Sequence, residues 1–278
     1  MSMLVRPSLT PQGAALALAQ WWELAGLEIP DLSKVRGGNP ETGLTASTIV
    51  QSQEPNLTPA RLVQGSHHPQ VALVQAHRLA AACTSMDALY KALDAFEGCR
   101  LKANARTTVF ADGRQGASIM VIGDVPGRED DEAGKPFLGP AGGLLDKMLG
   151  SIGLYRATNC YMTNLVPWRP PGDRSPTAEE IALCRPFVVR HIELAAPKAI
   201  LMVGGLTGQT LLNSTDGIMK LRSQTLDYRL GLDAQGASTY AQCVFAPTYL
   251  LNRPIEKAAA WQDLKRFAQK ISAMGIAI

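Results

Sequence analysis

The sequence predicts an α/β protein with three layers, in which helices cover both faces of a central, mostly parallel, four-stranded sheet. Two observations lead to this fold class. Short apolar runs of strand length alternate with segments of helical periodicity along residues 71–278. The runs are apolar at consecutive positions, as expected for parallel strands that are buried on both faces. A helical extension is expected before this domain.

The predicted strands are four apolar runs bounded by turn residues, at 118–122, 159–165, 199–203 and 242–246. Helical spacing of apolar residues predicts helices at 71–96, 142–152, 177–195, 206–212 and 256–272. The helix at 177–195 has the clearest start, because Thr177 and Glu180 form a capping-box pattern. Ligands of such sheets lie beyond the carboxyl ends of the strands, so the loops there are the expected site.

The first 70 residues differ in composition from this domain. Residues 14–25 are apolar at helical spacing and end at Gly26, which predicts a short helix within an N-terminal segment 1–29. Residues 30–70 are rich in Pro, Gly, Ser, Thr and Gln, which predicts a flexible linker. The domain is therefore expected to span 71–278.

Composition narrows the function only slightly. The chain has 278 residues, of which 46% are hydrophobic and 18% charged, and its net charge of +3 permits binding to nucleic acid without arguing for it. No apolar run approaches the ~20 residues of a membrane span, and no export signal opens the chain, so we expect a cytoplasmic protein without membrane contact. The five cysteines are widely spaced and are expected to be free thiols.

Candidate site residues follow the first two predicted strands. The first leads into the tight loop Gly123–Gly127, which places Asp124 at the edge of the sheet, although an Asp that caps a turn would look the same. The second brings Asn164 to this edge, where its amide could read the carbonyl and N–H of a pyrimidine such as uracil, or simply cap a turn. The proline-rich loop beyond it carries Arg169 and Arg174, which could contact phosphate or lie in an ordinary solvated turn.

Taken in order, these segments resemble the iron–sulfur (family 4) uracil-DNA glycosylases. The resemblance rests on Gly123–Asp131, Gly134–Gly139, Ala141–Leu145, Thr163–Val166, Arg169–Pro171 and Pro197–Ile200. It extends over roughly residues 98–267, and the ordered set is specific although no single segment is. It implies a base excision repair enzyme that flips uracil, and other deaminated bases, out of DNA and hydrolyses the N-glycosidic bond to leave an abasic site.

The resemblance also implies roles by position. Asp124 takes the place of the catalytic carboxylate on the sugar side of the scissile bond. Phe137 takes that of the ring on which the flipped base stacks, and Asn164 that of the amide that reads its edge. Gly123, Val125 and Ala246 would complete the base pocket, and Arg169, Arg174, Tyr249, Leu250 and Leu251 would contact DNA, the leucines as a wedge in the vacated gap. Core packing is the alternative for Phe137 and the leucines.

Two departures from the family pattern alter what is expected. The family holds a [4Fe–4S] cluster with four cysteines, and the corresponding positions here are Phe96, Cys99, Trp168 and Cys184. Because two thiolates are half of the required ligands, we predict no iron–sulfur cluster, no other metal and no cofactor, with the space filled by packing.

The second departure is Ala246, at the position of the family's His-Pro-x-x-Leu-Leu histidine, which donates a hydrogen bond to O2 of the leaving uracil. The loss of one such donor typically costs ~10²–10³ in rate, which is small beside the acceleration of ~10⁶ or more that enzymes achieve. No other histidine is expected at the sheet edge: three lie at 67, 68 and 77, and His191 is predicted on the solvated side of its helix. Asp124 would then work largely alone.

We therefore expect an active, monomeric glycosylase whose partner is uracil-containing DNA, single- or double-stranded. One alternative is a catalytically silent homologue that binds uracil or DNA and lacks the electrophile at Ala246. Another is a nucleotide-handling enzyme, which the lack of a P-loop or dinucleotide fingerprint in the sequence disfavours.

Overall fold

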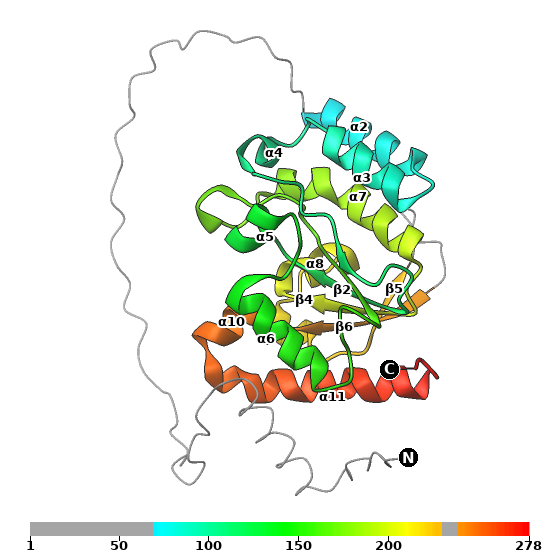
Figure 1. Cartoon of the computed structure of the whole chain (residues 1–278), viewed down its shortest axis with the longest axis vertical. Coiled ribbons are helices and arrows are strands. Elements are labelled where there is room, and N and C mark those ends of the chain that lie inside the picture. Colours follow the sequence, from blue (N-terminus) through cyan, green and yellow to red (C-terminus); the bar gives the residue numbers. More distant parts are fainter. Residues whose placement is uncertain (1–68, 230–237, 278) are drawn as a thin grey trace, which may run out of the picture.

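The computed structural model describes residues 69–229 and 238–277. The predicted N-terminal helix, nearly all of the predicted linker, and His67 and His68 lie outside the described residues. Within them, an α/β domain is found in which helices cover both faces of one sheet, as predicted (Figure 1). No described helix is long and apolar enough to cross a membrane.

The sheet has six strands in the order β1-β3-β2-β4-β6-β5. The four central strands are parallel to one another and confirm the predicted ones to within a few residues: β2 (Ile119–Gly123), β3 (Cys160–Asn164), β4 (Ala199–Val203) and β6 (Ser238–Val244). Every residue of β2, β3 and β4 is buried, which explains why β2 and β4 are apolar without alternation.

The predicted number of four strands was too low, because two antiparallel edge strands complete the sheet. β1 (Asp112–Gly113) pairs with β3, and β5 (Leu226–Arg229) pairs with β6. β1 has only two residues, and β5 carries charged residues at two of its four positions. Neither strand therefore has the apolar run by which the buried strands are recognised.

Each face of the sheet has its own core. Met120 and Ile122 of β2 belong to the cluster formed with α2 (Pro69–Ala82), α3 (Met86–Ala95) and α7 (Ala178–Ala195). Ile119 and Val121 belong to the cluster on the other face, with α6 (Gly139–Gly150) and α11 (Lys257–Ala273). The alternation of side chains along β2 thus joins the two helical layers through one sheet.

The single helix predicted at 71–96 is in fact two helices, α2 and α3, which are separated at residues 83–85. Ser85 causes the new start, because its hydroxyl accepts a hydrogen bond from Ala88 N (3.2 Å) as the N-cap of α3. The capping box at the start of α7 is confirmed: Thr177 Oγ1 accepts from Glu180 N (3.2 Å), and Glu180 Oε2 accepts from Thr177 N (2.7 Å).

Shorter elements occupy the loops around the sheet. They are α4 (Arg100–Asn104), α5 (Arg128–Ala133), α8 (Gly205–Leu212), α9 (Ile218–Leu221), α10 (Pro247–Asn252) and the 3₁₀ turns at Pro171–Asp173 and Pro254–Glu256. Three of them, α5, α8 and α10, follow the carboxyl ends of β2, β4 and β6, and so surround the edge where a ligand site was expected.

Candidate active site

The register of the sheet aligns the ends of the four parallel strands. Gly123 of β2 lies opposite Asn164 of β3 and Val203 of β4, and Val203 lies opposite Val244 of β6. A cavity of about 520 Å³ opens beyond these ends. Four of the predicted site residues, Asp124, Val125, Phe137 and Ala246, line this cavity together. The structure therefore joins the loops after β2 and β6 in one site.

Gly123 allows the Phe137 ring and the Asn164 amide to approach each other. A Cβ atom on Gly123 would lie 2.5 Å from Asn164 Oδ1 and 2.6 Å from Phe137 Cζ, so a larger residue would separate the two. Asn164 is buried beside the cavity and does not form part of its wall. Its Nδ2 has no hydrogen-bond partner among the described residues. Because buried amide donors are nearly always bonded in folded proteins, this atom is suited to a ligand carbonyl.

Asp124 is held at the start of α8. Its Oδ1 accepts hydrogen bonds from Thr207 N and Thr207 Oγ1, both at 2.7 Å. Burial raises the pKa of Asp124 above its usual value, and hydrogen bonds from Thr207 and Leu206 act in the opposite direction by stabilising the carboxylate. The first turn of a helix also favours negative charge. The hydrogen bonds thus fix the orientation of the Asp124 carboxyl group and stabilise its ionised form.

Gly204 provides the space that this arrangement needs. Its φ is +121°, and a Cβ atom there would lie 2.2 Å from Asp124 Oδ2. Sequence reasoning missed both Gly204 and Thr207 as site residues. The Gly204-Gly205 pair at the end of the third predicted strand could have indicated that another group approaches the backbone there. Nothing in the sequence indicated Thr207.

The loop after β6 contradicts one predicted DNA contact. Leu250 is completely buried in the core, so it cannot be a wedge in DNA, whereas Leu251 is 43% exposed. These residues are consecutive in helix α10 and therefore point in different directions. Tyr249 stacks on Phe245 with ring centroids 5.0 Å apart. Ala246 is the N-cap of α10 and makes no side-chain hydrogen bond.

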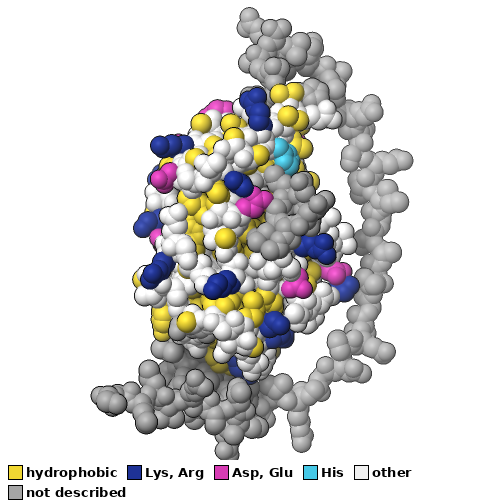
Figure 2. All heavy atoms as spheres, turned by 90° about the vertical axis from the view of Figure 1, so that its right-hand side faces the viewer, with side chains coloured by type: hydrophobic (Ala, Val, Ile, Leu, Met, Phe, Trp, Pro, Cys, Tyr) yellow, Lys and Arg dark blue, Asp and Glu magenta, His cyan; other side chains and the backbone are white. Residues whose placement is uncertain are grey.

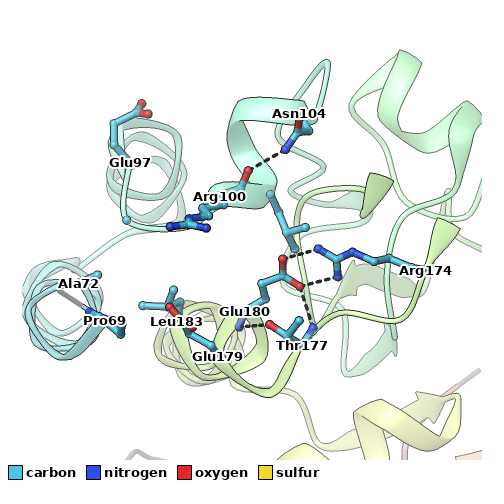
Figure 3. Close-up of a pocket in the computed structure, with 12 residues that line it drawn as sticks. Pro69, Ala72, Glu97, Arg100, Asn104, Arg174, Thr177, Glu179, Glu180 and Leu183 are labelled. Carbon is cyan, nitrogen blue, oxygen red and sulfur yellow. Dashed lines mark hydrogen bonds and ion pairs between the residues drawn. The ribbon is translucent and has the colours of Figure 1, made fainter. Parts of the chain in front are cut away.

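The two predicted phosphate-binding arginines are both paired with acids. Arg169 Nε and Nη2 donate to the carboxylate of Asp173 at 2.7 and 2.9 Å. Arg174 donates to both carboxylate oxygens of Glu180, at 2.8 and 2.6 Å (Figure 3). Arg174 lines a separate cavity of about 470 Å³, so the structure does not bring it to the cavity of Asp124.

Charged side chains of both signs are mixed on the described surface and around the cavity. On the face shown in Figure 2, the described Lys and Arg side chains are spread singly, with Asp and Glu side chains between them. The cavity itself is lined by four acids, Asp124, Glu129, Asp130 and Asp173, and by Arg128. The described lining of the cavity is therefore mainly acidic, and a DNA contact there cannot rest on a basic lining.

The four positions that correspond to cluster ligands lie together in the core of the α2–α3–α7 face. Phe96, Cys99, Trp168 and Cys184 are all buried there. The Phe96 ring packs against Phe187 at 5.2 Å, and Trp168 Nε1 donates to Thr108 Oγ1 at 3.2 Å. Among the described residues, no three His, Cys, Asp or Glu side chains are placed to hold a metal ion. These residues do not fit a cluster that needs four protein ligands.

The prediction for His191 was wrong, because its side chain is buried. Its Nε2 lies 2.9 Å from Tyr161 Oη, and its ring stacks on Phe110 at 4.4 Å. Burial lowers its pKa to about 3, so the ring is neutral at physiological pH. Neither His191 nor the exposed His77 on α2 lines the cavity of Asp124.

Comparisons with known proteins relate the sequence of this chain to one superfamily. Residues 110–265 match the profile of the uracil DNA glycosylase superfamily. A type-4 uracil-DNA glycosylase of Archaeoglobus fulgidus is 31% identical over 185 residues, which are 66% of this chain and 92% of the relative. One of Pyrobaculum aerophilum is 30% identical over 183 residues, 64% of this chain and 91% of the relative. One of Thermotoga maritima is 32% identical over 180 residues, 64% and 90% of the two chains.

Proposed function

The chain belongs to the uracil DNA glycosylase superfamily, and we propose that it is a DNA repair enzyme that hydrolyses the N-glycosidic bond of uracil in DNA. The relatives named type-4 uracil-DNA glycosylase support this activity. The observation that carries it is the position of Asp124, which is held by Thr207 on the wall of the cavity that Phe137 and Ala246 also line.

Recognition requires the base to leave the DNA stack, at a cost of a few kcal/mol. Stacking on the ring of Phe137 would recover ~1–3 kcal/mol. Asn164 Nδ2, which lacks a partner among the described residues, would donate to a carbonyl oxygen of the base. Other deaminated bases present similar carbonyl groups, so we include them in the proposed substrate range.

In the chemical step, the C1′–N1 bond breaks and its electron pair leaves with uracil, while a water oxygen forms a bond to C1′. The water loses a proton to solvent and the uracil anion gains one, so the products are free uracil and an abasic site. The sugar becomes positively charged in the transition state. Asp124, in its ionised form, would stabilise this charge and orient the attacking water. Ala246 offers no side-chain donor to the departing base, so Asp124 carries more of the catalysis than a carboxylate assisted by a histidine would.

DNA contacts are proposed for Leu251, Tyr249 and Arg169. Leu251 is the exposed apolar residue next to the cavity loop, and a side chain of this kind can fill the gap that a flipped base leaves. Tyr249 is partly exposed beside it. Arg169 would exchange Asp173 for a phosphate oxygen when DNA binds.

We also propose that the protein functions without an iron–sulfur cluster. Phe96 and Trp168 fill two of the corresponding positions with buried aromatic rings, and only Cys99 and Cys184 remain as thiols. Metal analysis of protein purified without oxygen should find iron well below one atom per chain. Stoichiometric iron together with acid-labile sulfide would contradict this.

The activity is tested by uracil release from single- and double-stranded oligonucleotides with one uracil, measured with enzyme in excess. Wild type should release uracil, and Asp124→Asn should lower the rate by about 10²–10⁴. Asp227→Asn is the matched control, since Asp227 is exposed on the edge strand β5 and should leave the rate unchanged.

The lack of a donor at Ala246 favours one other candidate, a silent homologue that binds uracil-DNA without turnover. This alternative would be supported if wild type bound the uracil-containing oligonucleotide more tightly than the uracil-free one but released no base. That outcome would refute hydrolysis.

A further inference from the structure

We propose that Arg156 is a positioning residue that holds the backbone of Phe137 in the conformation that presents its ring to the base. This inference rests on the proposed function, because it concerns the ring on which uracil would stack. Arg156 lies in the loop between α6 and β3 and does not line the cavity of Asp124. Any influence on the base would therefore pass through Phe137.

The backbone of Phe137 needs support because its conformation is an unfavourable one. Its φ is +58°, in the left-handed region that bulky residues rarely adopt. Such a conformation persists in a folded protein only where the surrounding structure imposes it. Phe137 is also the residue whose ring approaches Gly123 and the Asn164 amide. The strained backbone and the proposed base-stacking ring thus belong to the same residue.

Arg156 contacts this backbone directly. Its Nη2 donates to the carbonyl oxygen of Phe137 at 2.8 Å, and its Nη1 lies 3.4 Å from the carbonyl oxygen of Pro136. Asp112 accepts from Nη1 at 2.8 Å, and Asp146 accepts from Nε and Nη2 at 3.0 and 2.9 Å. The guanidinium side chain is only 20% exposed. Two carboxylates therefore fix the Arg156 guanidinium, which in turn binds the strained loop. Arginine suits this role because its donors are held in a rigid, planar fork.

Asp130 and Gly142 also restrict the loop that contains Phe137. Leu138 N donates to Asp130 Oδ1 at 2.6 Å, and Asp130 is only 6% exposed. The Phe137 carbonyl lies against helix α6, where a Cβ atom on Gly142 would be 1.9 Å from the oxygen. Because Gly142 has no side chain, the Phe137 carbonyl can lie against α6 while it accepts the hydrogen bond from Arg156. Asp130, Arg156 and Gly142 thus all restrict one peptide group, the amide between Phe137 and Leu138.

If Arg156 positions the Phe137 ring, changes at the two residues should weaken substrate binding in the same way. Binding is measured as the enzyme concentration that half-saturates single-turnover uracil release. Arg156→Met and Phe137→Leu should each raise this concentration by about 5- to 150-fold, the range for loss of one base–aromatic stack. Arg156→Lys keeps the charge without the fork and should give an intermediate value. The double variant should match Phe137→Leu to within about twofold, because Arg156 acts through the ring.

A second pair of variants keeps the test decisive if Arg156→Met fails to fold. Gly142→Ala displaces the same carbonyl without touching the ion pairs of Arg156, and it should show the same loss and the same dependence on Phe137. Gly143→Ala is the matched control in the same helix, since a Cβ atom there meets nothing within 4 Å. It should behave as wild type.

Effects that multiply in the double variants would overturn the proposal, because Arg156 or Gly142 would then act independently of the ring. An absence of uracil release by wild type would instead refute the proposed function. The same cycle, measured as the ratio of Kd values for uracil-containing and uracil-free DNA, would then still decide the positioning role.

Discussion

The two loops that enclose the cavity are held in place by different kinds of contact. On the β2 side, Asp124 is bonded to Thr207 and the Phe137 carbonyl to Arg156. On the β6 side, α10 is anchored by the buried side chain of Leu250 and by the stacking of Tyr249 on Phe245. Hydrogen bonds to charged groups fix orientation, whereas apolar packing is not directional. The polar groups on the β2 side are therefore held in defined orientations, which is what the proposed chemistry requires of them.

The largest gain in rate is expected from placing a donor on the β6 side. Ala246→His adds the side chain that the family uses to stabilise the leaving base, and we expect the single-turnover rate to rise by about 10²–10³. Ala246→Leu adds volume without a donor and should give no gain. Equal rates for both variants would show that the β6 side cannot take part in chemistry even when a donor is present.

A smaller change should separate the two leucines of α10. Leu250→Ala removes a fully buried side chain, so it should lower the free energy of unfolding by about 2–5 kcal/mol. Leu251→Ala should leave unfolding within about 0.5 kcal/mol of wild type, and it should weaken uracil release from double-stranded more than from single-stranded DNA. Denaturant unfolding and the two substrates together measure this. A similar loss of stability in both variants would contradict the assignment of Leu251 to the surface.

The smallest change should come from removing a single hydrogen bond to Asp124 on the β2 side. In the proposed mechanism Asp124 acts in its ionised form. Because burial raises its pKa, the rate should fall on acidification at a higher pH than for an ordinary Asp. Thr207→Val removes a hydrogen bond that favours the carboxylate, and the acidic limb of the pH–rate profile should move to higher pH by about one unit or less. Thr239→Val is the control, since Thr239 is bonded to Pro197 and not to Asp124. A shift to lower pH would contradict the role of Thr207.

Local patterns in the sequence were sufficient for much of the fold. The four parallel strands and the capping box at Thr177 depend on neighbouring residues, and both were predicted. The edge strands β1 and β5 were missed because they are short or polar and are defined by their partners. The break at Ser85 was missed because the apolar spacing continues across it.

The candidate site was predicted where a residue directly follows a strand. Asp124 lines the cavity for this reason, and Phe137 and Ala246, which the family resemblance indicated, line it too. The roles of the three residues stay predictions. The exposure of a side chain is decided by packing, so Leu250, His191 and Arg174 were predicted to lie where the structure does not place them.

By itself, the sequence determined the order of strands and helices and which residues stand at the strand ends, because periodicity and motif order are properties of neighbours along the chain. Only the tertiary structure decided which atoms meet. Thr207 reaches Asp124 across 83 residues, and Arg156 reaches Phe137 across 19. Such contacts exist only after helices have packed on the sheet, so no local sequence pattern could predict them.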